Sequence, residues 1–284
     1  MIEELQNIER QAMGNSRVHR LDARTKIILA FAAIIAMVAY PYSPDVIVPG
    51  VLLFAFFTVI WAFSGLSAVT YLKRLILILP FGIFIIIFQI FFENSRYDTF
   101  TPILNLPLGI HVYAESVEFA TILLIKFIVC ISFIILLSST TTMQDMLAGA
   151  RRLGMPSEFV LVIGLMIRYL FVFAEIYGKV ITVFEIRFFN AFDRNLPYRY
   201  RLKTLAYAIG SLFIRSYEQG ERTYVSMLCR GYSKDSFLRV EKKKIHAKEL
   251  CFLIFGVIFI VAGVLLPYMV YYRGLVLPVL SSLI

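Results

Sequence analysis

The sequence predicts an all-α, polytopic membrane protein with about five transmembrane helices and a cytoplasmic helical insert between the fourth and the fifth. Of its 284 residues, 60% are hydrophobic and only 17% are charged, and the mean hydropathy is +0.79. The hydrophobic residues come in blocks close to the ~20 residues that a helix needs to cross ~30 Å of hydrocarbon. Basic residues collect in some of the connections between these blocks and avoid others, which indicates how the chain is oriented.

The first four spans are predicted within the region 27–137, at the apolar blocks 27–40, 46–63, 75–92 and 119–137. The segment before them, residues 1–26, is polar and rich in arginine, and the second connection carries Lys73 and Arg74. The first connection has no basic residue, and the third has only Arg96. Because Lys and Arg concentrate on the cytoplasmic side, we expect the segment 1–26 to be cytoplasmic.

Two more apolar blocks follow, at 250–272 and, less purely apolar, at 159–184. The block 159–184 decides the rest of the topology. It carries Arg168, Glu175 and Lys179, which fall within about 40° of one another on a helix and form one narrow polar stripe. If this block crossed the membrane, the many basic residues between 187 and 248 would lie outside. We therefore predict a cytoplasmic insert at 138–249, which holds most of the 28 Lys and Arg residues, and a last helix with an external C-terminus at 250–284.

Turn-forming residues divide this insert into at least three helices. Gly154 and Pro156 are a stop and a restart signal after a first helix that ends near Arg152. The second helix is expected at about 156–189 and the third at about 200–229, where Gly231 fits a C-terminal cap.

No motif for catalysis or for a cofactor is found in the sequence. There is no phosphate-binding loop, nucleophile elbow or HExxH segment, and the three histidines and three cysteines are scattered without ligand spacing. The net charge of +9 is interpreted as orienting the helices rather than binding nucleic acid. The sequence therefore predicts a protein that is not an enzyme and that binds no cofactor or metal itself.

Four basic residues stand out as functional candidates. Lys126 lies within a span, where a charge costs ~2.5–3.5 kcal/mol, so it either contacts a partner or an ion path, or is satisfied by Gln89 or backbone carbonyls. Arg168 is a possible contact to a partner or within the bundle. Arg187 and Arg230 come at the ends of predicted helices, where an arginine ordinarily interacts with the helix dipole for ~0.3–1 kcal/mol.

Several linked motifs give the chain a resemblance to a known family. They are, in chain order, SRVHRLDARTK at 16–26, RRLGMP at 151–156, RYLFV at 168–172, SLFIRSYE at 211–218 and CRGY at 229–232. Together they resemble the transmembrane T component of energy-coupling factor (ECF) transporters, most closely its cobalt branch, over nearly the whole chain.

The resemblance implies a membrane scaffold whose cytoplasmic coupling helices contact two ATPase subunits through short X-Arg-X motifs. Arg230, with Gly231 after it, corresponds to the second motif. Arg187 is the best match to the first, although Ile186 and Phe188 are bulky where small residues are common. An arginine suits this role because its planar, permanently charged fork binds a carboxylate bidentately.

The resemblance further implies a separate membrane subunit that captures Co²⁺ or Ni²⁺, and ATP hydrolysis by the partner subunits alone. The alternative is a stand-alone channel or secondary permease, in which polar residues and broken helices would be expected within the spans. Apart from Lys126, Gln89, Pro49 and Pro80, the spans contain few such features.

Overall fold

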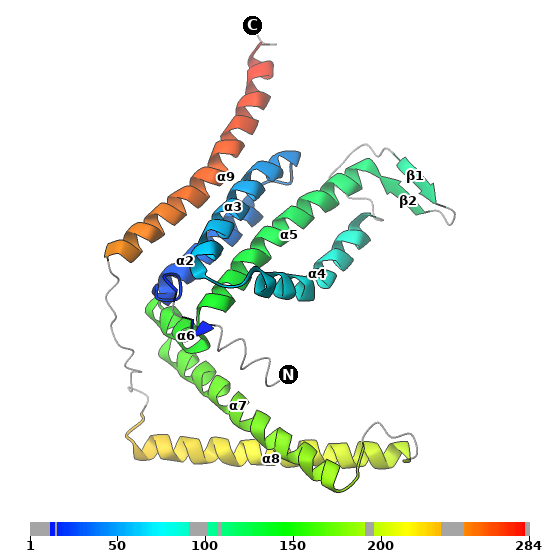
Figure 1. The fold of residues 1–284 in the computed structure, drawn as a ribbon, viewed down its shortest axis with the longest axis vertical. Helices are drawn as coiled ribbons and strands as arrows, with labels where there is room; N and C mark the ends of the chain where they lie inside the picture. The colour runs from blue at the N-terminus through cyan, green and yellow to red at the C-terminus, as the bar shows by residue number, and fades with distance from the viewer. Residues whose placement is uncertain are drawn as a thin grey trace. The chain divides into compact units, whose positions relative to one another are not determined.

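The computed structural model describes residues 12–14, 16–90, 102–106, 110–190, 196–233 and 247–281 (Figure 1). Its helices confirm the predicted all-α class. They are α2 (Ala23–Ala39), the short 3₁₀ helix η1 (Pro44–Val46), α3 (Ile47–Ser64), α4 (Ala68–Ile90), α5 (Ala114–Thr140), α6 (Met143–Arg152), α7 (Ser157–Ile186), α8 (Tyr198–Cys229) and α9 (Ala247–Ser281). A small antiparallel hairpin, β1 (Pro102–Leu106) and β2 (Ile110–Tyr113), precedes α5 and is an addition to the predicted helices.

The chain divides into two compact units. The first, called here the bundle unit, comprises Asn7–Gly149 and Lys243–Ile284, and therefore contains α2 to α5 and α9. The second, called the insert unit, comprises Met1–Gln6 and Ala150–Lys242 and contains α7 and α8. The boundary falls within α6, so the first part of the region expected as an insert, residues 138–149, belongs to the bundle unit.

Helix α5 is the centre of the bundle unit. It packs against α2, α3 and α4, and α9 packs against α2 and α3. Phe57, Phe133, Met37 and Leu53 are the largest fully buried side chains between these helices. Lipid is as apolar as these side chains, so close packing rather than exclusion of water has to hold the helices together in a membrane.

Two glycines allow neighbouring helices of the bundle unit to approach closely. A Cβ atom at Gly82 would lie 2.2 Å from the ring of Phe127, and one at Gly256 would lie 2.5 Å from Cδ1 of Leu29. A side chain at either position would force the facing side chain, or the helix that carries it, to shift. These contacts follow the use of small residues at helix interfaces in membranes.

Five helices in the described part of the chain are long and apolar enough to cross a membrane, and this confirms a multi-pass membrane protein. They are Pro44–Ser64, Ala68–Gln89, Ala114–Thr140, Ser157–Ile186 and Glu249–Met269. The number matches the prediction, but the membership differs: α7 is included, and α2, with 17 residues, is not. At 1.5 Å per residue α2 extends about 25 Å, at the short end of the range for a span.

Candidate functional site at the ends of α7 and α8

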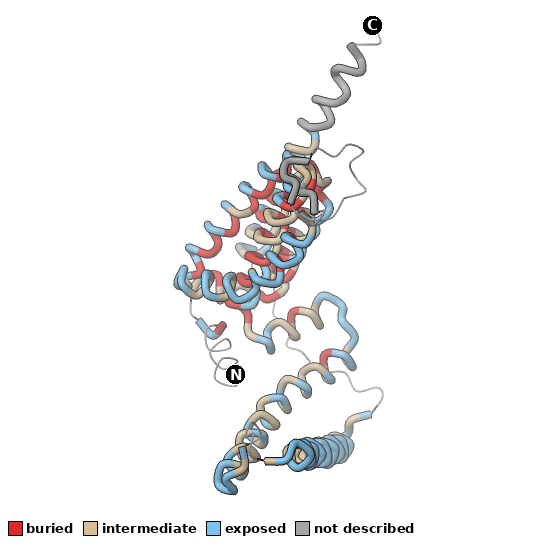
Figure 2. The backbone as a smooth tube through the Cα atoms, turned by 90° about the vertical axis from the view of Figure 1, so that its right-hand side faces the viewer, coloured by how far each residue is buried: buried red, intermediate tan, exposed pale blue. Residues whose placement is uncertain are grey.

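The insert unit exposes most of its surface. Val160 is the only buried residue of α7, and α8 has none. In Figure 2 α8 is seen nearly end-on, and its visible turns have the colours of exposed and intermediate residues. The two helices contact each other, with a hydrogen bond between the Tyr169 and Thr223 hydroxyls. Large apolar side chains nevertheless remain exposed on both, among them Phe159, Val162 and Met166 on α7 and Tyr207, Phe213 and Tyr217 on α8. Apolar exposure on this scale indicates surfaces that other molecules cover.

Arg187 lies where α7 ends. It is the C-cap residue, and its amide donates to the Val183 carbonyl at 3.1 Å. Phe188 then turns into the left-handed region with φ 52°, and the Phe189 amide donates to the carbonyl of Phe184, five residues earlier, at 2.9 Å. This pattern is a Schellman-type helix end.

Arg230 occupies the same position at the end of α8. It is the C-cap residue, Gly231 follows with φ +84°, and the Tyr232 amide donates to the carbonyl of Met227, again five residues earlier, at 3.0 Å. Each arginine is therefore the residue immediately before a left-handed turn that closes a long helix. The two X-Arg-X segments therefore share one backbone geometry. Their sequences do not make this obvious, because the first segment has Phe188 at the left-handed position and the second has Gly231.

Neither guanidinium is used to stabilise its own helix end. Both arginines are exposed, and within the described residues neither side chain makes a hydrogen bond or an ion pair. Arg151, near the end of α6, behaves differently, because its Nη1 donates to the Met155 carbonyl at 2.9 Å within its own cap. Unlike Arg151, Arg187 and Arg230 do not cap their own helices through their side chains. Their charges are therefore available to a partner.

Phe188 is the unusual residue of the first segment. It is 96% exposed, and it is the one non-glycine residue with positive φ in the described part of the chain. A left-handed conformation costs an L-residue roughly 1–2 kcal/mol, and such strain is concentrated at functional sites. Sequence reasoning noted Phe188 only as a bulky neighbour of Arg187; its alignment with Gly231 was the signal for its backbone conformation.

Arg168 lies on the exposed surface of α7, in the polar stripe that the sequence predicts. In the same stripe Lys179 forms an ion pair with Glu175 at 2.9 Å, with both side chains more than two thirds exposed. An exposed pair of this kind contributes ~0.5 kcal/mol or less. The stripe is therefore a polar face of α7, and Arg168 is not brought together with Arg187.

Lys126 is buried inside the bundle unit, with 6% of its surface exposed. Its Nζ donates to the Tyr40 carbonyl and, at 3.4 Å, to the Val38 carbonyl, and it lies 3.9 Å from the centre of the Tyr42 ring. These carbonyls are at the C-terminal end of α2, where a positive charge also interacts favourably with the helix dipole. Of the alternatives left open by the sequence, the structure shows backbone carbonyls as its partners.

Lys26 makes the reciprocal contact at the other end of α2. Its Nζ donates to the Thr140 carbonyl, at the C-terminal end of α5, at 2.7 Å, and to the His19 carbonyl at 3.0 Å. Each of the antiparallel helices α2 and α5 thus supplies a lysine to the C-terminal carbonyls of the other.

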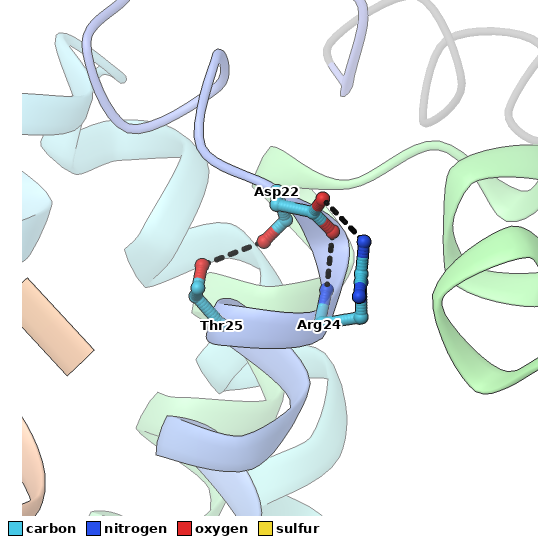
Figure 3. Close-up of polar contacts among 3 residues, drawn as sticks. All are labelled: Asp22, Arg24 and Thr25. Atoms are coloured by element: carbon cyan, nitrogen blue, oxygen red, sulfur yellow. Dashed lines mark hydrogen bonds and ion pairs between the residues drawn. The ribbon is translucent and has the colours of Figure 1, made fainter. Parts of the chain in front are cut away.

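The residues of the segment 16–26 build the start of α2. Asp22 is the N-cap and accepts a hydrogen bond from the Arg24 amide at 3.0 Å, and its carbonyl accepts one from the Thr25 hydroxyl at 2.6 Å (Figure 3). The Arg24 guanidinium pairs with the Asp22 carboxylate at 3.5 Å. Ser16 and His19 are joined through Oγ and Nδ1 at 2.7 Å. These contacts satisfy several polar groups of the segment within a few residues and give it a structural role at the start of α2.

A metal-binding cluster is not found in the described residues, which contain no group of three or more His, Cys, Asp or Glu side chains placed to hold an ion. His111 lies in β2, and His246 lies outside the described residues.

Comparisons with known proteins identify a family for most of the chain. Residues 14–240 match the family described as cobalt transport protein (CbiQ). Two uncharacterized proteins of Methanocaldococcus jannaschii are similar to the chain. One is 28% identical over 197 residues, covering 69% of this chain and 65% of that protein, and the other is 25% identical over 264 residues, covering 93% of each. Because the family match spans most of the sequence, the chain belongs to the CbiQ cobalt transport protein family, the T components of ECF transporters.

Proposed function

We propose that this chain is the scaffold and coupling subunit of an ATP-driven ECF-type importer for cobalt or nickel. Its family makes it a transporter component rather than a catalytic enzyme. In the proposed role it joins two ATPase subunits to a separate membrane subunit that captures the metal ion. The observation that carries this proposal is the shared geometry of the Arg187 and Arg230 helix ends, because two equivalent contacts suit a pair of similar ATPase subunits.

The chemistry of each contact follows from the arginine. At both positions the guanidinium is exposed and has no partner within the described residues, and its fork matches a carboxylate. A carboxylate in a groove of each ATPase subunit would bury this pair. Removing one member of a buried interfacial pair costs about 2–5 kcal/mol, largely because the other charge is left unpaired.

The apolar faces of α7 and α8 provide the rest of the proposed interface. Phe159, Phe213 and Tyr217 are exposed on these helices, and an apolar membrane surface of the metal-capture subunit would cover them. ATP-driven closure of the ATPases would move α7 and α8 through the arginine contacts. The apolar faces would then pass this movement to the capture subunit.

The proposal requires the N-terminus and the insert to be cytoplasmic, as the loop charges predict. Cys229 is exposed in the insert unit and offers a native label. An impermeant thiol reagent applied outside intact cells should leave Cys229 unlabelled and should label a cysteine placed at Asn105 in β1. Labelling of Cys229 from outside would place the insert on the wrong side for contact with cytoplasmic ATPases.

The coupling arginines are tested by copurification of the ATPase subunits and by metal uptake in cells. Arg230→Ala should weaken ATPase association tenfold or more, and the double change with Arg187→Ala should abolish uptake while the chain still inserts. Arg222→Ala, an exposed arginine eight residues earlier on α8, serves as the matched control and should have little effect. Lysine at either position should rescue only in part, because an ammonium is not bidentate. Full association and uptake by the double alanine variant would contradict the proposal.

A further inference from the structure

The bundle unit contains an open apolar groove between α3 and α9. Its volume is about 600 Å³, within the ~300–1,000 Å³ typical of sites for small ligands. It is lined by Arg17, Val18, Leu21, Ala55, Phe56, Val59, Ile60, Phe63, Phe252, Phe255 and Phe259. Arginine is the one charged or polar residue among these, so the groove suits a hydrocarbon ligand rather than a nucleotide, a sugar or a metal ion.

The groove has one charged end. Its long walls come from the second half of α3 and from the first turns of α9, both of which are apolar. The segment that leads into α2 contributes Arg17 at the mouth, where the side chain is exposed and has no ion pair with the described residues. A cation at the end of an apolar groove complements a ligand with an anionic head and an apolar tail.

The position of this charge matches the membrane surface. Arg17 lies just before the N-terminus of α2, at the end of the bundle where Lys26 reaches Thr140. In the topology proposed above this is the cytoplasmic end, where anionic lipids attract Lys and Arg side chains near the surface. Aromatic walls such as Phe63 and Phe255, both about 60% exposed, can pack against an acyl chain without any hydrogen bond.

We propose that this groove binds one anionic phospholipid, with an acyl chain between α3 and α9 and the headgroup phosphate at Arg17. The bound lipid would fill the space between the two helices and hold α9 against α3 in the assembled bundle. The cytoplasmic placement of the headgroup rests on the proposed topology. The site itself does not depend on the ATPases or on metal transport.

The test measures lipid binding to the full chain in detergent by native mass spectrometry, with phosphatidylglycerol, phosphatidylcholine and inorganic phosphate as probes. Phosphatidylglycerol should bind most tightly, and phosphate alone should neither bind nor compete. Arg17→Gln should weaken phosphatidylglycerol binding about fivefold, the equivalent of ~1 kcal/mol, and should leave phosphatidylcholine binding unchanged. Arg20→Gln is the control, because Arg20 is also exposed in this segment but does not line the groove.

A second pair of variants tests the apolar part of the groove. Ala55→Trp should fill it and weaken binding of both lipids, whereas Ala62→Trp, on the same helix but not in the lining, should not. Equal binding of the two lipids by the wild type, or lipid binding that survives Ala55→Trp, would overturn the proposal. If Ala55→Trp keeps its lipid and instead loses a membrane partner, the groove would be assigned to a helix of that partner, and the proposal would also be overturned. Because none of these readouts involves the ATPases, their outcome is independent of the coupling test.

Discussion

Replacing Lys126 by methionine tests whether this buried lysine holds the bundle together. Methionine keeps the length of the apolar stem and removes the ammonium. Lys126 donates to the Val38 and Tyr40 carbonyls and lies 3.9 Å from the centre of the Tyr42 ring. These three groups are at the end of α2 or in the connection that follows it, so the substitution removes polar contacts between α5 and that end of α2.

The expected loss follows from these contacts. A buried carbonyl that loses its donor costs about 1–3 kcal/mol, and a desolvated cation over an aromatic ring contributes up to about 2 kcal/mol. The substitution also removes the penalty of burying a charge, which is several kcal/mol and offsets part of the loss. We expect a net destabilisation of about 2 kcal/mol, equivalent to a fall in Tm of about 4–8 °C for a chain of this size.

Thermal unfolding of the purified chain in detergent measures this change. Lys73→Met is the matched control, because Lys73 is exposed on α4 and its loss should move Tm by about a degree or less. Metal binding by the assembled transporter should be nearly unchanged in Lys126→Met, since a cation does not favour Co²⁺. An unchanged Tm would refute the structural role, and a large loss of metal binding with intact assembly would place Lys126 on the ion path.

Three further predictions concern helix ends. Lys26→Met should destabilise the bundle by about 1–3 kcal/mol through loss of the Thr140 and His19 contacts, and its effect on Tm should add to that of Lys126→Met because α2 separates the two sites. Gly231→Ala should cost about 1 kcal/mol because φ is +84°, seen as faster hydrogen exchange in the last turn of α8. Phe188→Gly should slow hydrogen exchange in the last turn of α7, because it relieves backbone strain, and it should weaken ATPase association, because it removes an exposed side chain next to Arg187. Unchanged association would show that the Phe188 side chain does not contact the ATPase.

The helices of the insert were the most predictable part of the fold. Gly154, Pro156 and Gly231 act within a few residues of where they stand, so they indicate helix ends directly from the sequence. The expected ranges 156–189 and 200–229 accordingly agree with α7 (Ser157–Ile186) and α8 (Tyr198–Cys229) to within a few residues.

The membrane spans show where a single signal is insufficient. By length and hydropathy α7 qualifies as a span and α2 does not, whereas the loop charges favour the opposite choice. Hydropathy reports only how apolar a helix is, and a helix covered by partner proteins can be as apolar as one covered by lipid. The cytoplasmic location of α7 therefore remains a prediction that depends on charge.

Contacts between distant residues could not be predicted. Lys26 and Thr140 are 114 residues apart, and Lys126 and Tyr40 are 86 apart, so no local pattern joins them. The left-handed turn at Phe188 was missed for a different reason: the X-Arg-X alignment places Phe188 opposite Gly231, but phenylalanine does not favour the left-handed conformation, so the turn was not expected there. The X-Arg-X motifs singled out both arginines as candidates, and the structure adds that the two helix ends share one backbone geometry.

Site-specific crosslinking tests the central claim most directly, because it asks what the two helix ends touch. Cys229 is a native, exposed cysteine next to Arg230, and Phe188→Cys places a second one next to Arg187; each would carry a photoreactive group in a chain without the other cysteines. Both positions should yield adducts with ATPase subunits in native membranes, whereas a cysteine at the exposed Ser67, in the bundle unit, should not. Adducts with ATPase subunits from neither helix end, in membranes that transport the metal, would contradict the coupling role of Arg187 and Arg230.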